Sequence, residues 1–272
     1  MSAKADEVKQ TINLYTSADK EVKDDEALDV TGAPSDENAD PLVMPNLVSK
    51  KPGMLRTKGN LTLHTRSAHQ LFYGRKKDEK KKIKPITGLV RFALNMNQLY
   101  DLAAKDDPYA DSVLISVEEK LEEVSVTIKN HIKELEEQLA DMEGITIDSH
   151  ESVQPISVPL EFRTTYGFIA AQLIGKYDKL IRLAQCAMHV TGTFLQSDWE
   201  RVVRKSGSNI RNAFWQSSRY RYTGVTRNDI AANNPIARNA IEKYGELPQE
   251  ILEGTKRGKY APKILGTKNS EG

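Results

Sequence analysis

Side chains suited to contact DNA recur at every second position in one short stretch of the sequence. Alternate side chains of a β-strand point to the same face, so Leu61, Leu63 and Thr65 would face a core while the polar residues face outward. In the major groove, arginine and lysine bind guanine O6 and N7, and asparagine binds adenine. The outward residues that this pattern predicts as DNA contacts are Arg56, Lys58, Asn60, Thr62, His64 and Arg66.

A second stretch, residues 159–164, has the same alternation, with Glu161 and Arg163 facing outward. With residues 60–65 it predicts a two-stranded antiparallel ribbon, a shape that fits the major groove. Glu161 would accept a hydrogen bond from cytosine N4 or pair with the neighbouring Arg56. We expect the strands to pair within one chain, while pairing across a dimer stays open. The alternative is a pair of ordinary strands with a solvated polar face.

A basic loop is predicted directly after the first strand and a short helix. The stretch from 75 to 84 contains seven basic and two acidic residues, and such a loop either neutralises phosphates whatever the base sequence or is simply solvated. The helix that follows would begin near Thr87 and present backbone N–H groups to a phosphate. The predicted phosphate contacts are Lys76, Lys77, Lys80, Lys81, Thr87 and Gly88.

The sequence contains no motif of an enzyme active site. It has no phosphate-cradling glycine loop, no Gly-x-Ser-x-Gly elbow and no His-Glu-x-x-His zinc motif. His64 and His69 span a strand-to-helix junction, and Cys186 with His189 would share a helix face without further ligands. We therefore expect no catalysis, no cofactor and no metal site, and a DNA strand-transfer enzyme is the least favoured function.

Charge divides the 272-residue chain into three segments. Residues 1–47 contain four lysines and eleven acidic residues, a net charge of −7. Because the whole chain carries a net charge of +1, residues 48–272 must carry +8. Such an acidic segment with few apolar residues predicts a disordered tail. Residues 48–254 are expected to form a helical DNA-binding body that includes the ribbon, and residues 255–272 a basic flexible tail. The basic body favours a polyanionic partner.

Helical periodicity dominates the body. The longest predicted helix runs from about Ser112 to Met142, and its apolar residues are spaced almost as in a heptad seam. We expect it to pack within its own domain, with an intersubunit coiled coil as the alternative. The predicted fold is mainly α with a small two-stranded antiparallel ribbon, ribbon-helix-helix-like with additional helices.

The expected location is the cytoplasm. A single cysteine excludes an intrachain disulfide framework. There is no secretory signal pattern, and no apolar run reaches the ~20 residues that a membrane-spanning helix needs. We expect no membrane partner.

Five ordered motifs carry a resemblance to a known family. They lie at residues 61–66, 107–110, 159–168, 224–229 and 245–250. Together they resemble the AcaB-like family of integrating-conjugative-element proteins.

This resemblance implies a ribbon-helix-helix DNA-binding regulator that activates conjugative transfer genes. Its implied partners are double-stranded promoter DNA, a second copy of the chain and RNA polymerase, and its implied place is the bacterial nucleoid. The alternative within the same family is a structural or accessory protein of the conjugation machinery.

Overall fold

The structure, a computed structural model, describes residues 59–76, 85–141, 150–192 and 194–265. Several predicted features lie outside these residues. They are the acidic segment 1–47, residues 266–272 and the candidate DNA contacts Arg56, Lys58, Lys77, Lys80 and Lys81.

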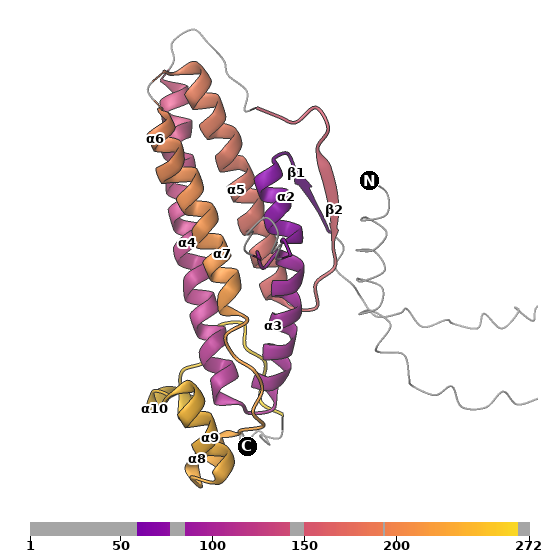
Figure 1. Cartoon of the computed structure of the whole chain (residues 1–272), viewed down its shortest axis with the longest axis vertical. Helices are drawn as coiled ribbons and strands as arrows, with labels where there is room; N and C mark the ends of the chain where they lie inside the picture. The colour runs from indigo at the N-terminus through magenta and orange to yellow at the C-terminus, as the bar shows by residue number, and fades with distance from the viewer. Residues whose placement is uncertain (1–58, 77–84, 142–149, 193, 266–272) are drawn as a thin grey trace, which may run out of the picture. The chain divides into compact units, whose positions relative to one another are not determined.

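Helices form most of the described chain (Figure 1). The longest helix, α4 (Pro108–Ala140), packs against α3 (Leu89–Ala104), α5 (Thr165–Val190) and α7 (Lys205–Gln216). The shorter elements are α2 (Arg66–Tyr73), α6 (Gln196–Trp199), the π-helix η1 (Glu200–Arg204), α8 (Arg227–Ala231), α9 (Pro235–Tyr244) and α10 (Gln249–Leu252). None of the helices in the described part of the chain is long and apolar enough to cross a membrane.

Two strands form a small antiparallel ribbon. They are β1 (Gly59–Leu63) and β2 (Ile156–Leu160), and Leu61 lies opposite Val158 in the register. The prediction of a mainly helical protein with a two-stranded antiparallel ribbon is therefore confirmed, and the strands pair within one chain. The predicted extent of the second strand was wrong, because β2 lies three to four residues before the predicted stretch 159–164.

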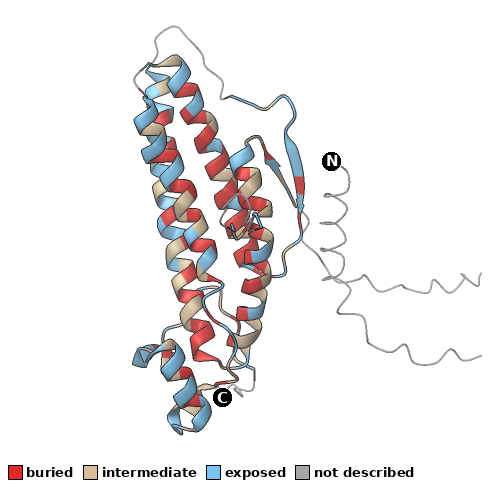
Figure 2. Ribbon diagram, viewed as in Figure 1, coloured by how far each residue is buried: buried red, intermediate tan, exposed pale blue. Residues whose placement is uncertain are grey.

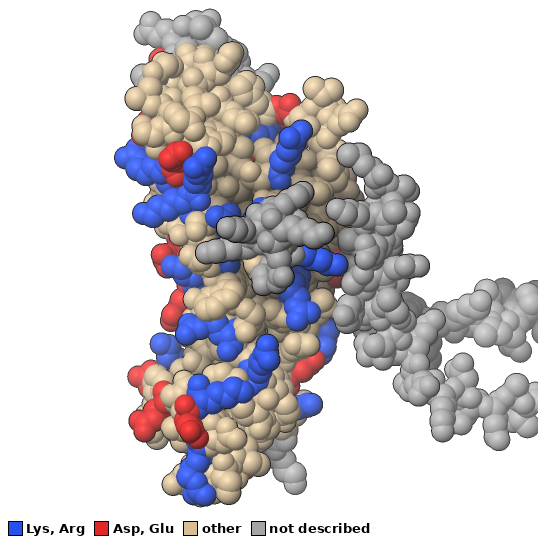
Figure 3. Space-filling view, in the orientation of Figure 1, with Lys and Arg blue, Asp and Glu red and all other residues tan. Residues whose placement is uncertain are grey.

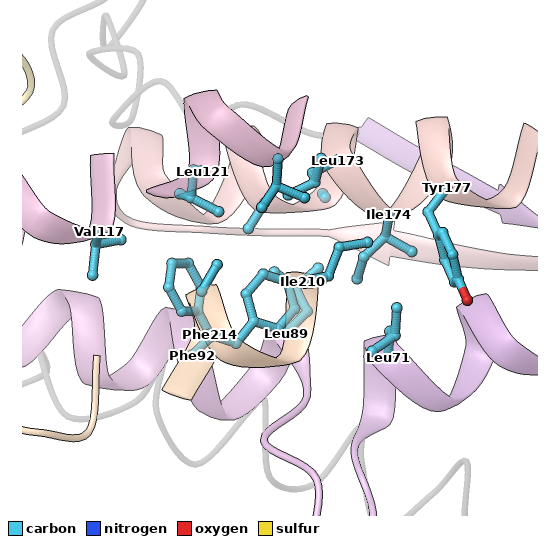
Figure 4. Packing of buried hydrophobic residues seen from close by; sticks show 14 of the residues in the cluster. Leu71, Leu89, Phe92, Val117, Leu121, Leu173, Ile174, Tyr177, Ile210 and Phe214 are labelled. Atoms are coloured by element: carbon cyan, nitrogen blue, oxygen red, sulfur yellow. The ribbon is translucent and has the colours of Figure 1, made fainter. Parts of the chain in front are cut away.

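The apolar seam of α4 lies inside the chain's own core. Figure 4 shows Val117 and Leu121 among side chains from α5 and α7, including Leu173, Ile210 and Phe214. Figure 2 shows that each long helix has buried residues on the sides that face other helices and exposed residues on the sides that do not. The prediction that this helix packs within its own domain is confirmed, since α5 and α7 cover the seam.

A buried aspartate begins α4. The Asp107 carboxylate accepts hydrogen bonds from the backbone N–H groups of Tyr109 at 3.0 Å and Ala110 at 3.1 Å, which would otherwise lack partners at a helix N-terminus. Pro108 follows as the first helical residue, a position where its missing N–H costs nothing. The Tyr220 hydroxyl donates to the second carboxylate oxygen at 2.6 Å. Asp107 thus connects the start of α4 to the segment that follows α7.

Part of the predicted C-terminal tail is packed against the helices, so the prediction of a flexible tail was wrong for residues 255–265. Both oxygens of the buried Asp111 carboxylate accept hydrogen bonds from the Arg257 guanidinium at 2.9 Å, and Arg227 donates to the same carboxylate at 2.7 Å. Glu118 accepts a hydrogen bond from the backbone N–H of Lys259 at 2.7 Å. Charge-assisted hydrogen bonds of this kind hold the segment against α4.

The stability of this fold should depend on the protonation of Asp107. Burial raises the pKa of Asp107 to about 6, although hydrogen bonds from Tyr220, Ala110 and Tyr109 lower it. Between about pH 4 and pH 6 the folded chain then holds a proton that the unfolded chain has released, so the free energy of unfolding falls as the pH rises through this window. The expected fall is up to about 3 kcal/mol, at about 1.4 kcal/mol per pKa unit.

Urea unfolding at about pH 4, 5, 6 and 7 measures this dependence. The matched variant is Asp107→Asn, which keeps an oxygen for the helix cap and has no titrating group. Its unfolding free energy should lack the part of the pH slope that Asp107 contributes. Equal slopes for the two proteins would contradict the assignment.

Candidate nucleic-acid interface

The outer face of the ribbon carries small polar side chains together with the exposed Pro159, which lies opposite Asn60. Asn60 and Thr62 of β1 are exposed and alternate with Leu61 and Leu63 on the opposite face, as the sequence predicts. Ser157 of β2 lies opposite Thr62 in the register and is also exposed. The outer face therefore presents amide and hydroxyl groups from both strands, and we call the surface formed by Asn60, Thr62 and Ser157 the ribbon face.

The inner face of the ribbon packs on the helical core. Leu63, Val158 and Leu160 are buried, and β1 contacts α5. Leu61 lies close to Gly175 of α5, where an added Cβ would be 3.3 Å from the leucine Cδ1 atom. A two-stranded ribbon alone is only marginally stable, and here the apolar inner face gives it a helix to pack on.

A buried carboxylate of α5 holds the junction between β1 and α2. Asp178 Oδ1 accepts hydrogen bonds from the backbone N–H of His64 at 3.2 Å, the N–H of Thr65 at 2.9 Å and the Thr65 hydroxyl at 2.8 Å. The Thr65 oxygen also accepts from Ala68 N at 3.3 Å and so caps α2. Arg182 Nε lies 3.5 Å from the other Asp178 oxygen. This network fixes the ribbon and α2 relative to α5.

Two predicted DNA contacts on this side of the ribbon lie beyond the end of β1. His64 follows the strand, and its ring atom Nδ1 accepts a hydrogen bond from the backbone N–H of Ser152 at 3.2 Å. Arg66 is exposed but is the first residue of α2. The prediction that both belong to the strand was wrong, because the Asp178 network ends the strand at Leu63 and starts the helix.

The two predicted contacts from the second strand also lie outside it. Glu161 is exposed just after β2, and Arg163 forms a two-fold ion pair with Asp101 of α3, with one N–O distance of 2.9 Å. The Phe162 ring packs edge-on to Phe168 at 5.3 Å. These contacts turn the chain from the ribbon into α5. The placement of Glu161 and Arg163 on the ribbon's outer face was therefore wrong.

The described phosphate candidates differ in exposure. Lys76 is exposed, Thr87 is half-buried and Gly88 is buried. A side chain at Gly88 would collide with the backbone of Gly74, so this glycine allows the end of α2 to approach the start of α3. Its position as a buried packing residue does not agree with the predicted phosphate contact.

The ends of the basic loop are held together. The backbone N–H groups of Arg75 and Ile86 each donate to the other's carbonyl, at 3.0 and 2.8 Å. Lys76, the next residue after Arg75, is therefore held close to the end of α2.

Comparison with known proteins identifies the family. The family described as "Transcriptional regulator AcaB" matches residues 51–265 of the chain. The chain belongs to the AcaB family of transcriptional regulators.

One solved structure is similar to this AcaB-family chain. It is the crystal structure of selenomethionine-containing AcaB from uropathogenic E. coli, with 15% sequence identity and a TM-score of 0.47. The similarity covers 75% of this chain and 100% of that one. No curated protein sequence matches the chain.

Sequence reasoning missed two residues that shape the ribbon of this AcaB-family chain. Ser157 belongs to the outer face, and the alternation of residues 156–160 was the signal that could have shown it. Asp178 lies in the middle of α5, 113 residues from Thr65. No local pattern marks such a residue, because its role depends on tertiary contacts alone.

Within the described ranges, no group of three or more His, Cys, Asp or Glu side chains is arranged to hold a metal ion.

Replacing Asp178 should loosen the ribbon before the rest of the fold. In Asp178→Ala, two backbone N–H groups and one hydroxyl lose their acceptor, and the expected loss of unfolding free energy is about 3 kcal/mol or more. Asp178→Asn keeps one oxygen and should lose less. Hydrogen exchange measures the effect by position: amides of β1 and β2 should exchange faster in Asp178→Ala, with little change in the middle of α4. Unchanged exchange in the ribbon would contradict the anchoring role.

Proposed function

We propose that this protein is a sequence-specific DNA-binding activator of conjugative transfer genes, and that it places the ribbon face in the major groove. The observation that carries the proposal is the exposed, uncharged ribbon face on a strand pair that is tied to α5 through Asp178. Its membership in a family of transcriptional regulators agrees with a DNA ligand.

The geometry of the ribbon suits base recognition. A two-stranded ribbon fits the width of the major groove, and small side chains let its backbone approach the bases closely. Asn60 can donate to and accept from adenine, while the hydroxyls of Thr62 and Ser157 can act as donors or acceptors toward any base. Because the anchor is buried and fixed, little ordering is needed when the ribbon binds.

Basic residues around the ribbon would supply the sequence-independent part of the affinity. Arg56 and Lys58 continue, toward the N-terminus, the two-residue spacing of Asn60 and Thr62 in the sequence. Arg66 is exposed at the start of α2. Lys76 adds a further exposed charge beside α2. In this proposal these cations contact phosphates, and the ribbon face contacts bases.

The assembly is also part of the proposal. A pair of chains on a two-fold symmetric operator would place two ribbons in successive major grooves, as in other dimeric DNA-binding proteins. RNA polymerase is the partner that an activator requires. The proposed function requires no cofactor.

The ribbon face should determine which DNA sequence the protein prefers. Duplexes enriched from a random library by the wild-type protein serve as the specific probe, and unselected duplexes as the reference. For Asn60→Ala/Thr62→Ala, the preference for the enriched sequence should fall by about tenfold or more, because a good base contact contributes about 1 to 3 kcal/mol of discrimination. Competition gel shifts measure the preference.

The matched control is Asn130→Ala/Asn239→Ala, which removes exposed polar side chains from α4 and α9. It should keep the wild-type preference, and both variants should keep the wild-type melting temperature. Two results would overturn the proposal: a wild-type protein that enriches no sequence, or a ribbon variant with undiminished preference.

A further inference from the structure

Basic side chains concentrate on the outer side of η1 and α7 and in residues 217–222, which follow α7. Residues 201–222 include six basic residues and no acidic one. Two large aromatic side chains in the same stretch, Trp215 and Tyr222, are 56% and 59% exposed. We call this surface the α7 basic face; its residues are Arg201, Arg204, Lys205, Arg211, Trp215, Arg219, Arg221 and Tyr222.

The buried side of α7 fixes the direction of this face. Phe214 stacks on Phe92 of α3 with ring centroids 4.7 Å apart, and the Asn95 amide of α3 donates to the Ser217 hydroxyl at 3.1 Å. At the other end, the Tyr177 hydroxyl of α5 donates to the Val203 carbonyl of η1 at 3.3 Å. Because both ends are held by interior contacts, the opposite side of the helix has to face solvent.

Most of the charge on this face is not neutralised locally. Arg201 pairs with Asp198 at 2.8 Å and Arg204 with Glu200 at 3.1 Å. No carboxylate in the described parts of the chain forms an ion pair with Lys205, Arg211, Arg219 or Arg221. Figure 3 shows basic side chains along the face on which α7 lies, whereas many of the acidic ones lie near α10.

The surroundings of the charges also suit a nucleic-acid backbone. The Arg219 guanidinium carbon lies 5.8 Å from the centre of the Trp215 ring, so a flat apolar surface adjoins a cation. A groove of about 480 Å³ lies between α4 and the helical stretch of η1 and α7, and its lining includes the cations Arg201 and Lys205 as well as the carboxylate of Glu134. The 12 residues of α7 form a helix about 18 Å long, which is enough to contact several phosphates.

We propose that the α7 basic face binds the phosphate backbone of double-stranded DNA, separately from the ribbon. In Figure 1, α5 and α2 lie between α7 and the ribbon. The contact is made by charge and is independent of base sequence. It rests on the proposed function only in taking DNA as the ligand, and it adds a second surface on the same chain that holds DNA without reading it.

Binding to a random-sequence duplex of about 30 base pairs tests this proposal without an operator, by fluorescence anisotropy of the full chain at about 50 to 200 mM salt. In Arg211→Gln/Arg219→Gln/Arg221→Gln, the dissociation constant at about 100 mM salt should rise at least tenfold. The slope of log affinity against log salt should become shallower by about 2 to 3, because each lost phosphate contact removes about one unit.

The control removes the same charge from another side of the molecule. Lys179 of α5 pairs with Glu136 of α4 at 2.6 Å, which places it on the side where these two helices meet. Lys129→Gln/Lys133→Gln/Lys179→Gln should change the affinity by less than about twofold, since non-specific affinity depends on the contacted phosphates. Equal losses in the two triple variants, or no loss in the α7 variant, would overturn the proposal.

The fluorescence of Trp215 provides a second measurement, which a change in net charge alone would not affect. Addition of the duplex should quench tryptophan fluorescence in the wild type, and Trp215→Phe, which retains Trp199, should abolish the quenching. Undiminished quenching in Trp215→Phe would contradict the proposal. Tighter binding of the corresponding single strand than of the duplex would contradict duplex DNA as the ligand.

The ribbon variant separates the two proposals. Asn60→Ala/Thr62→Ala should keep its affinity for the random duplex even if sequence preference is lost. Retained sequence preference in that variant, together with weakened random-duplex binding in the α7 variant, would reject the ribbon as the reading element and leave the α7 basic face in place.

Discussion

The buried carboxylate of Asp178 is the contact on which the ribbon depends. Two antiparallel strands have too little apolar surface to be stable alone, and the two strands here come from segments almost a hundred residues apart in the sequence. Asp178 ends β1, begins α2 through Thr65 and ties both to α5. The cost of burying a charge is offset by three donors at 2.8 to 3.2 Å and by the nearby Arg182.

This anchoring explains why the outer face of the ribbon can be small and uncharged. The inner leucines and Val158 pack on the helices, so the outer side chains contribute little to stability. Asn60, Thr62 and Ser157 are exposed on that side. The α7 basic face has the opposite composition, with exposed aromatic rings and six cations, of which only Arg201 and Arg204 form ion pairs within the described residues. We propose that the first surface discriminates between base sequences and that the second supplies affinity for phosphates.

Local sequence patterns predicted the elements but not their boundaries. The alternation at Asn60 to Leu63 identified β1 and its outward side correctly. The same rule placed the second strand too late, because residues 156–160 and 159–164 both alternate. What ends β2 is tertiary: the Phe162 ring packs on Phe168, and Arg163 reaches Asp101 of α3.

Contacts between distant residues account for the other errors. Residues 255–265 contain four basic residues and no acidic one, but Arg257 pairs with Asp111, which lies 146 residues earlier. The uniform charge of residues 201–222 was visible in the sequence. The side of α7 that faces solvent follows from the burial of Ile210 and Phe214 and not from the charge pattern alone.

Site-specific photocrosslinking to DNA tests the role of the ribbon most directly. A photoreactive amino acid replaces Thr62 or Ser157 on the ribbon face, or Asn130 on α4, and the protein is irradiated with the duplex that it enriches from a random library. We predict crosslinks from positions 62 and 157 to bases inside the preferred sequence and none from position 130. Absence of base crosslinks from both ribbon positions, with the DNA still bound, would contradict the ribbon as the element that reads DNA.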